Sequence, residues 1–206
     1  MTAARGRSLR LWLRVVPASW QAGIVALSAV LAAPVFAADS YTIDPAHSIP
    51  AFEFSHLGLT TQSGRFDKAK GVVVLDRGAR KGSVNYEIET ASLNMGFGTQ
   101  TDNSPGYHLF EVEKYPKITF KSDKLIFDHD NDVIAAEGRF TMLGVTRPLR
   151  VTVERFKCSL NPMNKKMMCT GNITTSIKRS DFGMVRFIPA ISDEVKISVP
   201  VEAYKD

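Results

Sequence analysis

The stretch Ala135–Val153, AAEGRFTMLGVTRPLRVTV, decides the fold of this 206-residue chain. Its first limb alternates between apolar or small side chains and polar ones, and the alternation returns from Leu149 onward. A period of two is typical of a half-buried β-strand. Segment 143–148, LGVTRP, holds the glycine and the proline that favour a turn. The stretch therefore predicts a hairpin whose dry face consists of Ala136, Gly138, Phe140, Met142, Leu149, Val151 and Val153.

The dry face of this hairpin has two small members. Ala136 and Gly138 are too small to fill the space that Phe140 and Met142 fill on the same face. A sheet that curls over such residues leaves room inside for a guest molecule. The sequence therefore predicts a domain with a hollow interior.

The first 37 residues have the parts of a secretory signal. Four arginines and no acidic residue lie within residues 1–14, an apolar run follows at residues 22–33, and small or branched residues lead to Ala37. The alternative is an uncleaved membrane anchor. Pro17 and Gln21 shorten the solid apolar run below the ~20 residues that a spanning helix needs, so cleavage after Ala37 is favoured.

The remainder, residues 38–206, is expected to form one domain without an internal linker. The leader holds four of the 26 basic residues and none of the 21 acidic ones, so the remaining domain carries a net charge of +1. A near-neutral domain without a basic stripe gives no electrostatic reason to expect nucleic acid as a partner.

Both cysteines, Cys158 and Cys169, lie in the part of the chain expected to be exported, where disulfides persist. Asn161, Pro162 and Asn164 between them favour a turn, which places the cysteines on opposite limbs of a hairpin. Their spacing matches neither a redox CxxC pair nor a zinc knuckle. We expect a structural disulfide.

Further strands are predicted along the rest of the domain. Segment 72–75 is apolar on both faces, which predicts a strand covered on both sides. Pro200 is tolerable in the last strand only at a sheet edge or a bulge. A break at residues 92–113 leads into a short helical segment near 107–114, ended by Pro116. The predicted strands cover residues 52–56, 64–66, 72–75, 81–90, 117–121, 125–127, 169–180 and 195–204.

These elements predict an all-β fold. About eight antiparallel strands of period two, with one helical fragment, fit either a closed barrel or two packed sheets. A barrel is favoured because closure removes exposed strand edges. At ~8 strands, the interior of a barrel holds packed side chains or one ligand.

Catalytic signatures such as GxSxG, HExxH, the P-loop and CxxC are absent from the sequence, so no catalytic residue is predicted. His47 and His56 would have to approach each other to bind metal or haem. Hydrogen-bonded histidines at a strand end are the favoured interpretation, and no metal site is predicted. Segment 128–132, DHDND, lacks the glycine and the glutamate of a calcium loop and is interpreted as a hairpin turn.

The segment KRSDFG contains two charged residues of inward parity. Arg179 and Asp181 share the parity of Ile173 and Ile177 near the end of a predicted strand. An inward arginine beside an aspartate is usually a buried structural ion pair, which is the favoured interpretation. Otherwise, Arg179 offers a charged donor to a ligand head group such as a phosphate.

Segments spread over nearly the whole of residues 38–206 keep a recognisable order: IDPAHS (43–48), Phe52 with His56, GRF (64–66), FEVEKYPKITF (110–120), GRFTMLGVTRPL (138–149), IKRSDFGM (177–184) and VKISVPVE (195–202). Through these segments the chain resembles the YceI-like family. One departure concerns the stretch before EKYP, where the family usually has a fuller histidine, leucine, serine and double-phenylalanine run and this chain reads DNSPGYHLFEV. This departure indicates that the segment capping the mouth of the family's apolar tunnel is altered.

The resemblance implies an extended, lipocalin-like, eight-stranded antiparallel barrel. Its apolar tunnel is expected to hold a polyisoprenoid, an isoprenoid quinone or another long-chain amphiphile such as a fatty-acyl lipid, with no required cofactor. A periplasmic location is implied, and loading from a membrane surface and an oligomeric state are compatible with it. The candidate ligand-binding residues are Phe52, Phe54, Phe66, Tyr86, Ile88, Phe110, Phe120, Phe140 and Phe182 as lining, and Arg179, Asp181, His47 and His56 as polar anchors.

Two other functions stay open at this point. One is a periplasmic enzyme or redox helper that acts on a quinone-like or lipid substrate, with His47, His56 or His108 as acid, base or metal ligand. The other is a structural or stress-related interaction protein whose barrel is filled by its own side chains. A fold by itself does not choose among these functions.

Overall fold

The computed structural model describes residues 38–96 and 105–206 of the chain. The predicted signal sequence, residues 1–37, lies outside the described residues, as do residues 97–104 of the predicted break. In the described part of the chain, no helix has the length and the apolar character needed to cross a bilayer.

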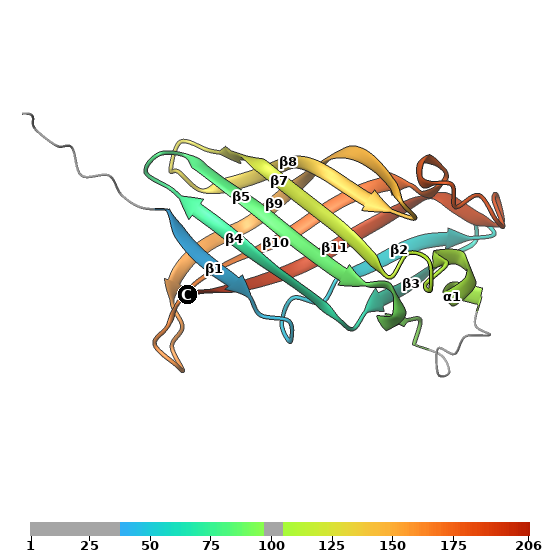
Figure 1. The fold of residues 1–206 in the computed structure, drawn as a ribbon, viewed down its shortest axis with the longest axis horizontal. Helices are drawn as coiled ribbons and strands as arrows, with labels where there is room; N and C mark the ends of the chain where they lie inside the picture. Colours follow the sequence, from blue (N-terminus) through green and yellow to red (C-terminus); the bar gives the residue numbers. More distant parts are fainter. Residues whose placement is uncertain (1–37, 97–104) are drawn as a thin grey trace, which may run out of the picture. The chain divides into compact units, whose positions relative to one another are not determined.

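The described residues form one antiparallel sheet with two 3-10 turns and one short α-helix (Figure 1). The strands are β1 (Asp39–Ile43), β2 (Ala51–His56), β3 (Thr60–Phe66), β4 (Ala69–Asp76), β5 (Lys81–Glu89), β6 (Leu93–Asn94), β7 (Lys117–Phe127), β8 (Val133–Met142), β9 (Val145–Leu160), β10 (Met167–Lys178) and β11 (Ile191–Lys205). The helical elements are η1 (Thr90–Ser92), α1 (Pro105–Phe110) and η2 (Arg179–Phe182).

The sheet closes on itself through the pairing of β1 with β11. The closed ring contains eight strands in the order β1, β4, β5, β7, β8, β9, β10 and β11. Strands β2, β3 and β6 continue from β11 as an extension of the wall at one end of the barrel (Figure 1). The prediction of an all-β, eight-stranded antiparallel barrel is therefore confirmed.

Strand β11 has two successive neighbours on one side. Its first part, up to Ser198, pairs with β2, and its last part, from Ala203, pairs with β1. Pro200 lies in the interval between these two ladders and is opposite Asn172 of β10. A strand can hold a proline where its ladder is interrupted, so the expected restriction on Pro200 is met.

The hairpin of β8 and β9 is confirmed, but the predicted turn at residues 143–148 is wrong in extent. The turn contains only Leu143 and Gly144, whose φ angles are 51° and 72°. Two positive φ angles give the backbone twist that matches paired strands, so two residues are enough. Pro148 consequently lies inside β9, opposite Arg139, in a part of β9 whose ladder with β10 has ended.

The prediction that segment 72–75 is covered on both sides is also wrong. Val73 and Leu75 face the interior of the barrel, whereas Val72 is 41% exposed. The barrel wall is a single sheet, so one face of β4 meets solvent even where that face is apolar. Such isolated exposed apolar residues are common on protein surfaces.

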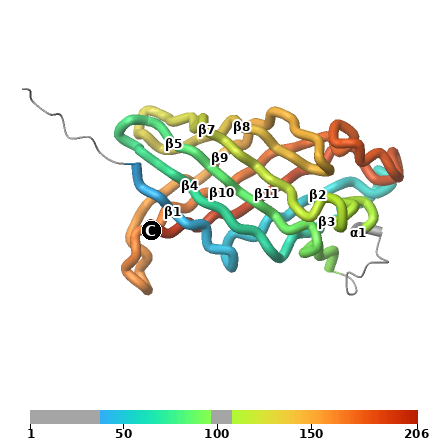
Figure 2. The backbone as a smooth tube through the Cα atoms, viewed as in Figure 1, coloured from blue at the N-terminus to red at the C-terminus, as the bar shows by residue number. Residues whose placement is uncertain are grey.

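The predicted helical segment exists, with earlier boundaries than expected. Helix α1 spans Pro105–Phe110 and ends because Glu111 adopts a left-handed φ of 44°, well before Pro116. The carbonyl of Glu111 then accepts hydrogen bonds from the N–H groups of Lys114 and Tyr115. The backbone trace shows α1 at the same end of the barrel as β2 and β3 (Figure 2).

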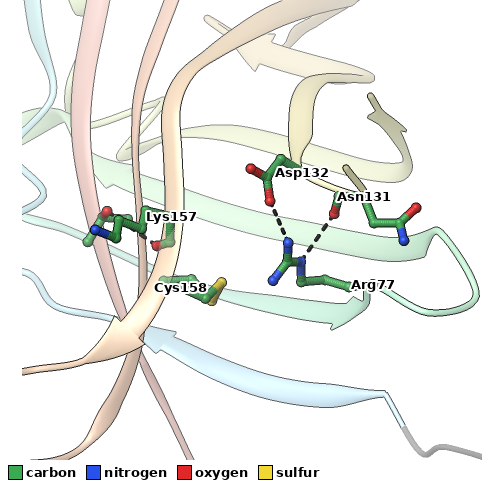
Figure 3. Close-up of a disulfide and its surroundings, with 7 residues drawn as sticks. Arg77, Asn131, Asp132, Lys157 and Cys158 are labelled. Atoms are coloured by element: carbon green, nitrogen blue, oxygen red, sulfur yellow. Dashed lines mark hydrogen bonds and ion pairs between the residues drawn. A yellow bond between two sulfur atoms is a disulfide. The ribbon is translucent and has the colours of Figure 1, made fainter. Parts of the chain in front are cut away.

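At the opposite end of the barrel, two arginines hold the β4–β5 turn against the β7–β8 turn. Arg77 donates to the Asn131 carbonyl and pairs with the Asp132 carboxylate (Figure 3). Arg80 donates to the carbonyls of Phe127 and Asp128. The segment DHDND is the β7–β8 turn, as predicted, with the Asp128 carboxylate accepting the N–H groups of Asp130 and Asp132.

Cys158 and Cys169 are directly opposite each other on β9 and β10 and form the expected disulfide, with Cα atoms 4.0 Å apart. The bond lies near the Arg77 contacts at this end of the barrel (Figure 3). It closes a loop whose ends are 11 positions apart.

We predict that the double substitution Cys158→Ala/Cys169→Ala lowers the free energy of unfolding by about 3 kcal/mol, because the unfolded chain regains loop entropy. Urea denaturation followed by circular dichroism measures the change. A reductant should destabilise the wild-type protein to the same level and leave the double variant unaffected. Equal unfolding midpoints for wild type and variant would contradict the prediction.

Candidate ligand-binding tunnel

The interior of the barrel contains an apolar cavity of about 150 Å³, here called the inner chamber. Its lining is almost entirely carbon, contributed by alternate residues of all eight strands of the ring. The lining residues include Val73, Leu75, Val84, Tyr86, Phe120, Leu125, Ala136, Leu149, Val151, Val153, Phe156, Ile173, Val199 and Val201.

A second cavity, of about 630 Å³, lies toward α1 and is here called the outer chamber. Three side chains, Ile88, Phe140 and Ile197, line both chambers. The two chambers therefore adjoin each other, with these three side chains between them, and together they are here called the bore. The outer volume falls in the range of about 300–1,000 Å³ that is usual for small-molecule pockets.

Small inward residues leave space inside the bore. The sequence predicted two such residues, Ala136 and Gly138, and only Ala136 has this role in the structure. Ala136 lines the inner chamber, as expected. Gly138 does not leave a gap, because a Cβ there would overlap the carbonyl of Lys121 on β7. Gly138 is required by the close approach of two strands at a bulge, and the other small residues that line the chamber are Gly171 of β10 and Ala203 of β11.

Aromatic rings form one wall of the outer chamber. The ring centroids of Phe52 and Phe66 are 5.7 Å apart, and Phe110 of α1 contacts Phe66 edge-on at 5.3 Å. The Phe52 ring lies across Gly64 of β3, where a Cβ would clash with it. Helix α1 thus contributes a side chain to the wall of this chamber.

Ten of the thirteen candidate residues line the bore. The outer chamber contains Phe52, Phe54, His56, Phe66, Phe110 and Arg179, the inner chamber contains Tyr86 and Phe120, and both contain Ile88 and Phe140. The other three lie elsewhere. Phe182 is buried behind Phe140, with ring centroids 5.4 Å apart, Asp181 is exposed, and His47 lies in a separate groove outside the barrel.

Arg179 is almost fully buried beside the outer chamber, but its expected ion pair with Asp181 does not form. Its guanidinium donates instead to four backbone carbonyls, at 2.8–2.9 Å, belonging to Met184, Arg186, Ile191 and Ser192. Burial lowers the pKa of this guanidinium from its ordinary value. These bonds use four of the five N–H groups of an arginine.

The same four bonds hold the loop between η2 and β11 in place. A buried carbonyl that loses its donor costs about 1–3 kcal/mol. Arg179 is therefore a positioning residue for the chamber wall, because Met184 of this loop and Ile191 at the start of β11 line the outer chamber.

We predict that Arg179→Met lowers the free energy of unfolding by about 3 kcal/mol or more, because several carbonyls lose their donor. The matched control is Arg147→Met, since Arg147 is exposed and makes a single bond to the Asp181 carbonyl. The control should change stability by less than about 0.5 kcal/mol. Thermal unfolding measures both variants, and an equal effect would contradict the assigned role of Arg179.

His47 and His56 do not form a joint site. His47 precedes β2 and His56 ends it, so the extended strand separates them by roughly 20 Å. The Nδ1 atom of His47 is 2.7 Å from the Asp44 carboxylate, near Glu202. The hydrogen bond to Asp44 and the negative charges of Asp44 and Glu202 raise the pKa of His47, and the same bond lowers the pKa of Asp44.

We predict that the pKa of His47, followed by NMR, lies above its ordinary value and falls back in Asp44→Asn. Glu202→Gln should lower the pKa less, because only its charge acts on the ring. Since the folded-state pKa is raised, the stabilisation by protonated His47 is complete below its unfolded-state pKa and is lost as the pH rises through the folded value. An unchanged titration in Asp44→Asn would contradict this account.

Most of the aliphatic residues that line the inner chamber were not among the predicted ligand-binding residues. Residues such as Val84, Val151, Ile173 and Val199 outnumber the aromatic ones around the inner chamber. The alternation of their strands already marks these residues as inward-facing. The predicted lining left them out because it was chosen mainly among aromatic side chains.

An eight-stranded antiparallel barrel with an apolar interior places the protein among the small β-barrels, whose interior is filled by side chains or holds one small ligand. The family model of the YceI-like domain matches residues 41–203, so the chain belongs to this family.

Several relatives resemble the chain along most of its length. A UPF0312 protein of Vibrio cholerae is 29% identical over 165 residues, covering 78% of this chain and 86% of the relative. The solved structure of Burkholderia cenocepacia BcnA is 25% identical, with a TM-score of 0.62, and covers 78% of this chain and 98% of that one. A polyisoprenoid-binding domain from Saccharophagus degradans, implicated in plant cell wall breakdown, is 18% identical with a TM-score of 0.57, covering 81% and 98%.

Proposed function

We propose that this protein is a periplasmic binding and carrier protein that holds the tail of a polyisoprenoid, an isoprenoid quinone or another long-chain lipid in its barrel. The observation that supports the proposal is the pair of adjoining, mainly apolar chambers inside the barrel. The predicted signal sequence and the Cys158–Cys169 disulfide fit an oxidising compartment outside the cytoplasm.

The distribution of polar groups gives the ligand a direction. The hydroxyl of Tyr86 in the inner chamber already donates to the Ser48 carbonyl at 2.8 Å. The outer chamber, by contrast, contains His56, Gln62 and Arg179, whose fifth N–H group is directed to the ligand in our proposal. The tail therefore enters the inner chamber, and the polar head stays in the outer chamber.

Burial of the tail supplies the binding energy. Each CH₂ group transferred from water contributes about 0.8 kcal/mol, so ten buried carbons contribute about 8 kcal/mol before the ordering costs of association. A binding role needs no acid–base pair in the bore. The distance between His47 and His56 rules out a joint site of these two histidines, whereas His56 by itself lines the outer chamber.

The direct test is extraction of the purified protein with organic solvent, followed by mass spectrometry of the extract. We expect a long-chain isoprenoid or acyl lipid in amounts approaching one per chain. A protein that yields no lipid and also fails to keep an added prenol or quinone in solution would overturn the proposal.

We predict that Ala136→Phe reduces prenol capture at least about tenfold, because the new ring occupies the inner chamber and excludes the tail. The matched control is Ile134→Phe on the same strand, where the side chain is 40% exposed on the outer face. It should capture prenol like the wild type. Ala136→Leu, a smaller insertion, keeps the test informative if the phenylalanine variant unfolds.

A further inference from the structure

Five large apolar side chains are exposed together at the α1 end of the barrel. They lie on the β2–β3 turn and on the loop between η2 and β11. We call this set the mouth patch; it consists of Leu57, Leu59, Val185, Phe187 and Ile188, with exposed fractions from 37% to 82%.

The two loops that carry the mouth patch are neighbours in space. The N–H of Leu57 donates to the Ala190 carbonyl at 2.6 Å, and His56 pairs with Ile191 in the ladder between β2 and β11. Within the second loop, the N–H of Ile188 donates to the Val185 carbonyl. The five apolar side chains therefore lie on two adjoining loops.

Residues next to the mouth patch in the chain line the outer chamber. His56 precedes Leu57, Met184 precedes Val185, and Ile191 follows the second loop, and all three of these neighbours line the chamber. The mouth patch therefore lies beside the outer chamber.

The charge of the two loops indicates which kind of membrane surface the mouth patch fits. Residues 57–59 and 183–190 contain no acidic residue, and their one charged residue is Arg186, whose guanidinium lies 4.7 Å from the centroid of the Phe187 ring. An apolar surface with an arginine at its edge suits the interface of a bilayer that contains anionic lipid.

Two members of the mouth patch hold bulky side chains at backbone positions that favour glycine. Leu57 and Phe187 adopt left-handed φ angles of 55° and 67°. Glycine or asparagine adopts such angles at lower cost than a bulky side chain. Large apolar residues at these positions add nothing to the barrel core, because both side chains are substantially exposed.

We propose that the mouth patch docks the barrel on an anionic lipid bilayer, with Leu57, Leu59 and Phe187 entering the interface and the outer chamber facing the membrane. The lipid ligand then passes between bilayer and bore without crossing water. This inference rests on the proposed lipid carriage, and the experiment below separates the two.

The test is flotation of the full protein with vesicles of phosphatidylethanolamine and phosphatidylglycerol that contain no prenol. We expect the wild type to float with these vesicles and Leu59→Asp/Phe187→Asp to lose at least about tenfold of the bound fraction. The matched control is Met163→Asp, at the tip of the β9–β10 hairpin at the other end, where the side chain is 91% exposed. This control should float like the wild type.

Prenol capture by the same proteins, measured without vesicles, distinguishes failure of docking from failure of carriage. We expect Leu59→Asp/Phe187→Asp to capture prenol normally. Docking is overturned if the wild type does not float, if Met163→Asp rather than the patch variant abolishes flotation, or if light scattering shows a dimer that the patch variant converts to a monomer. The last outcome would assign the patch to a second copy of the chain.

Discussion

The structure depends on burying one side of every strand inside a ring whose wall is a single sheet. Each strand places alternate side chains in the bore, so the interior is lined by eight apolar rows that face one another across a short distance. Within residues 38–96 and 105–206, no second layer covers the wall from outside, which explains why Val72 and Ile134 remain partly in contact with water. The hydrophobic core and the proposed ligand site consequently occupy the same place.

Because the hydrophobic core and the proposed ligand site coincide, close packing of the interior competes with the space that a ligand needs. A fully packed interior would give the largest stabilisation, because dispersion contacts are lost wherever a gap remains. The protein instead keeps small residues such as Ala136 and Gly171 at inward positions. Incomplete packing of the interior lowers the stability of the barrel. The contacts of Arg77 and Arg80 at one end and of Arg179 at the other offset part of this loss.

Much of the barrel could be predicted from sequence, because period-two alternation reports directly on which face of a strand is dry. The errors arose where a non-local contact decides. Leu143 and Gly144 make a two-residue turn that keeps Pro148 within β9, and the partners of Arg179 come from a loop whose course local sequence does not specify. Gly138 was predicted to leave space in the interior. The glycine is instead required by the close approach of β7, which depends on the register between the strands and cannot be read from local sequence.

The ladder that closes the ring joins the two extremities of the described chain. Ser40 and Asp206, bonded to each other, are 166 positions apart. Contacts between such distant positions carry a high loop-closure entropy and form late, which makes folding slow. In our proposal the chain is exported from its amino terminus, so the ring closes only after β11 has crossed the membrane, and the apolar inner rows stay exposed until then.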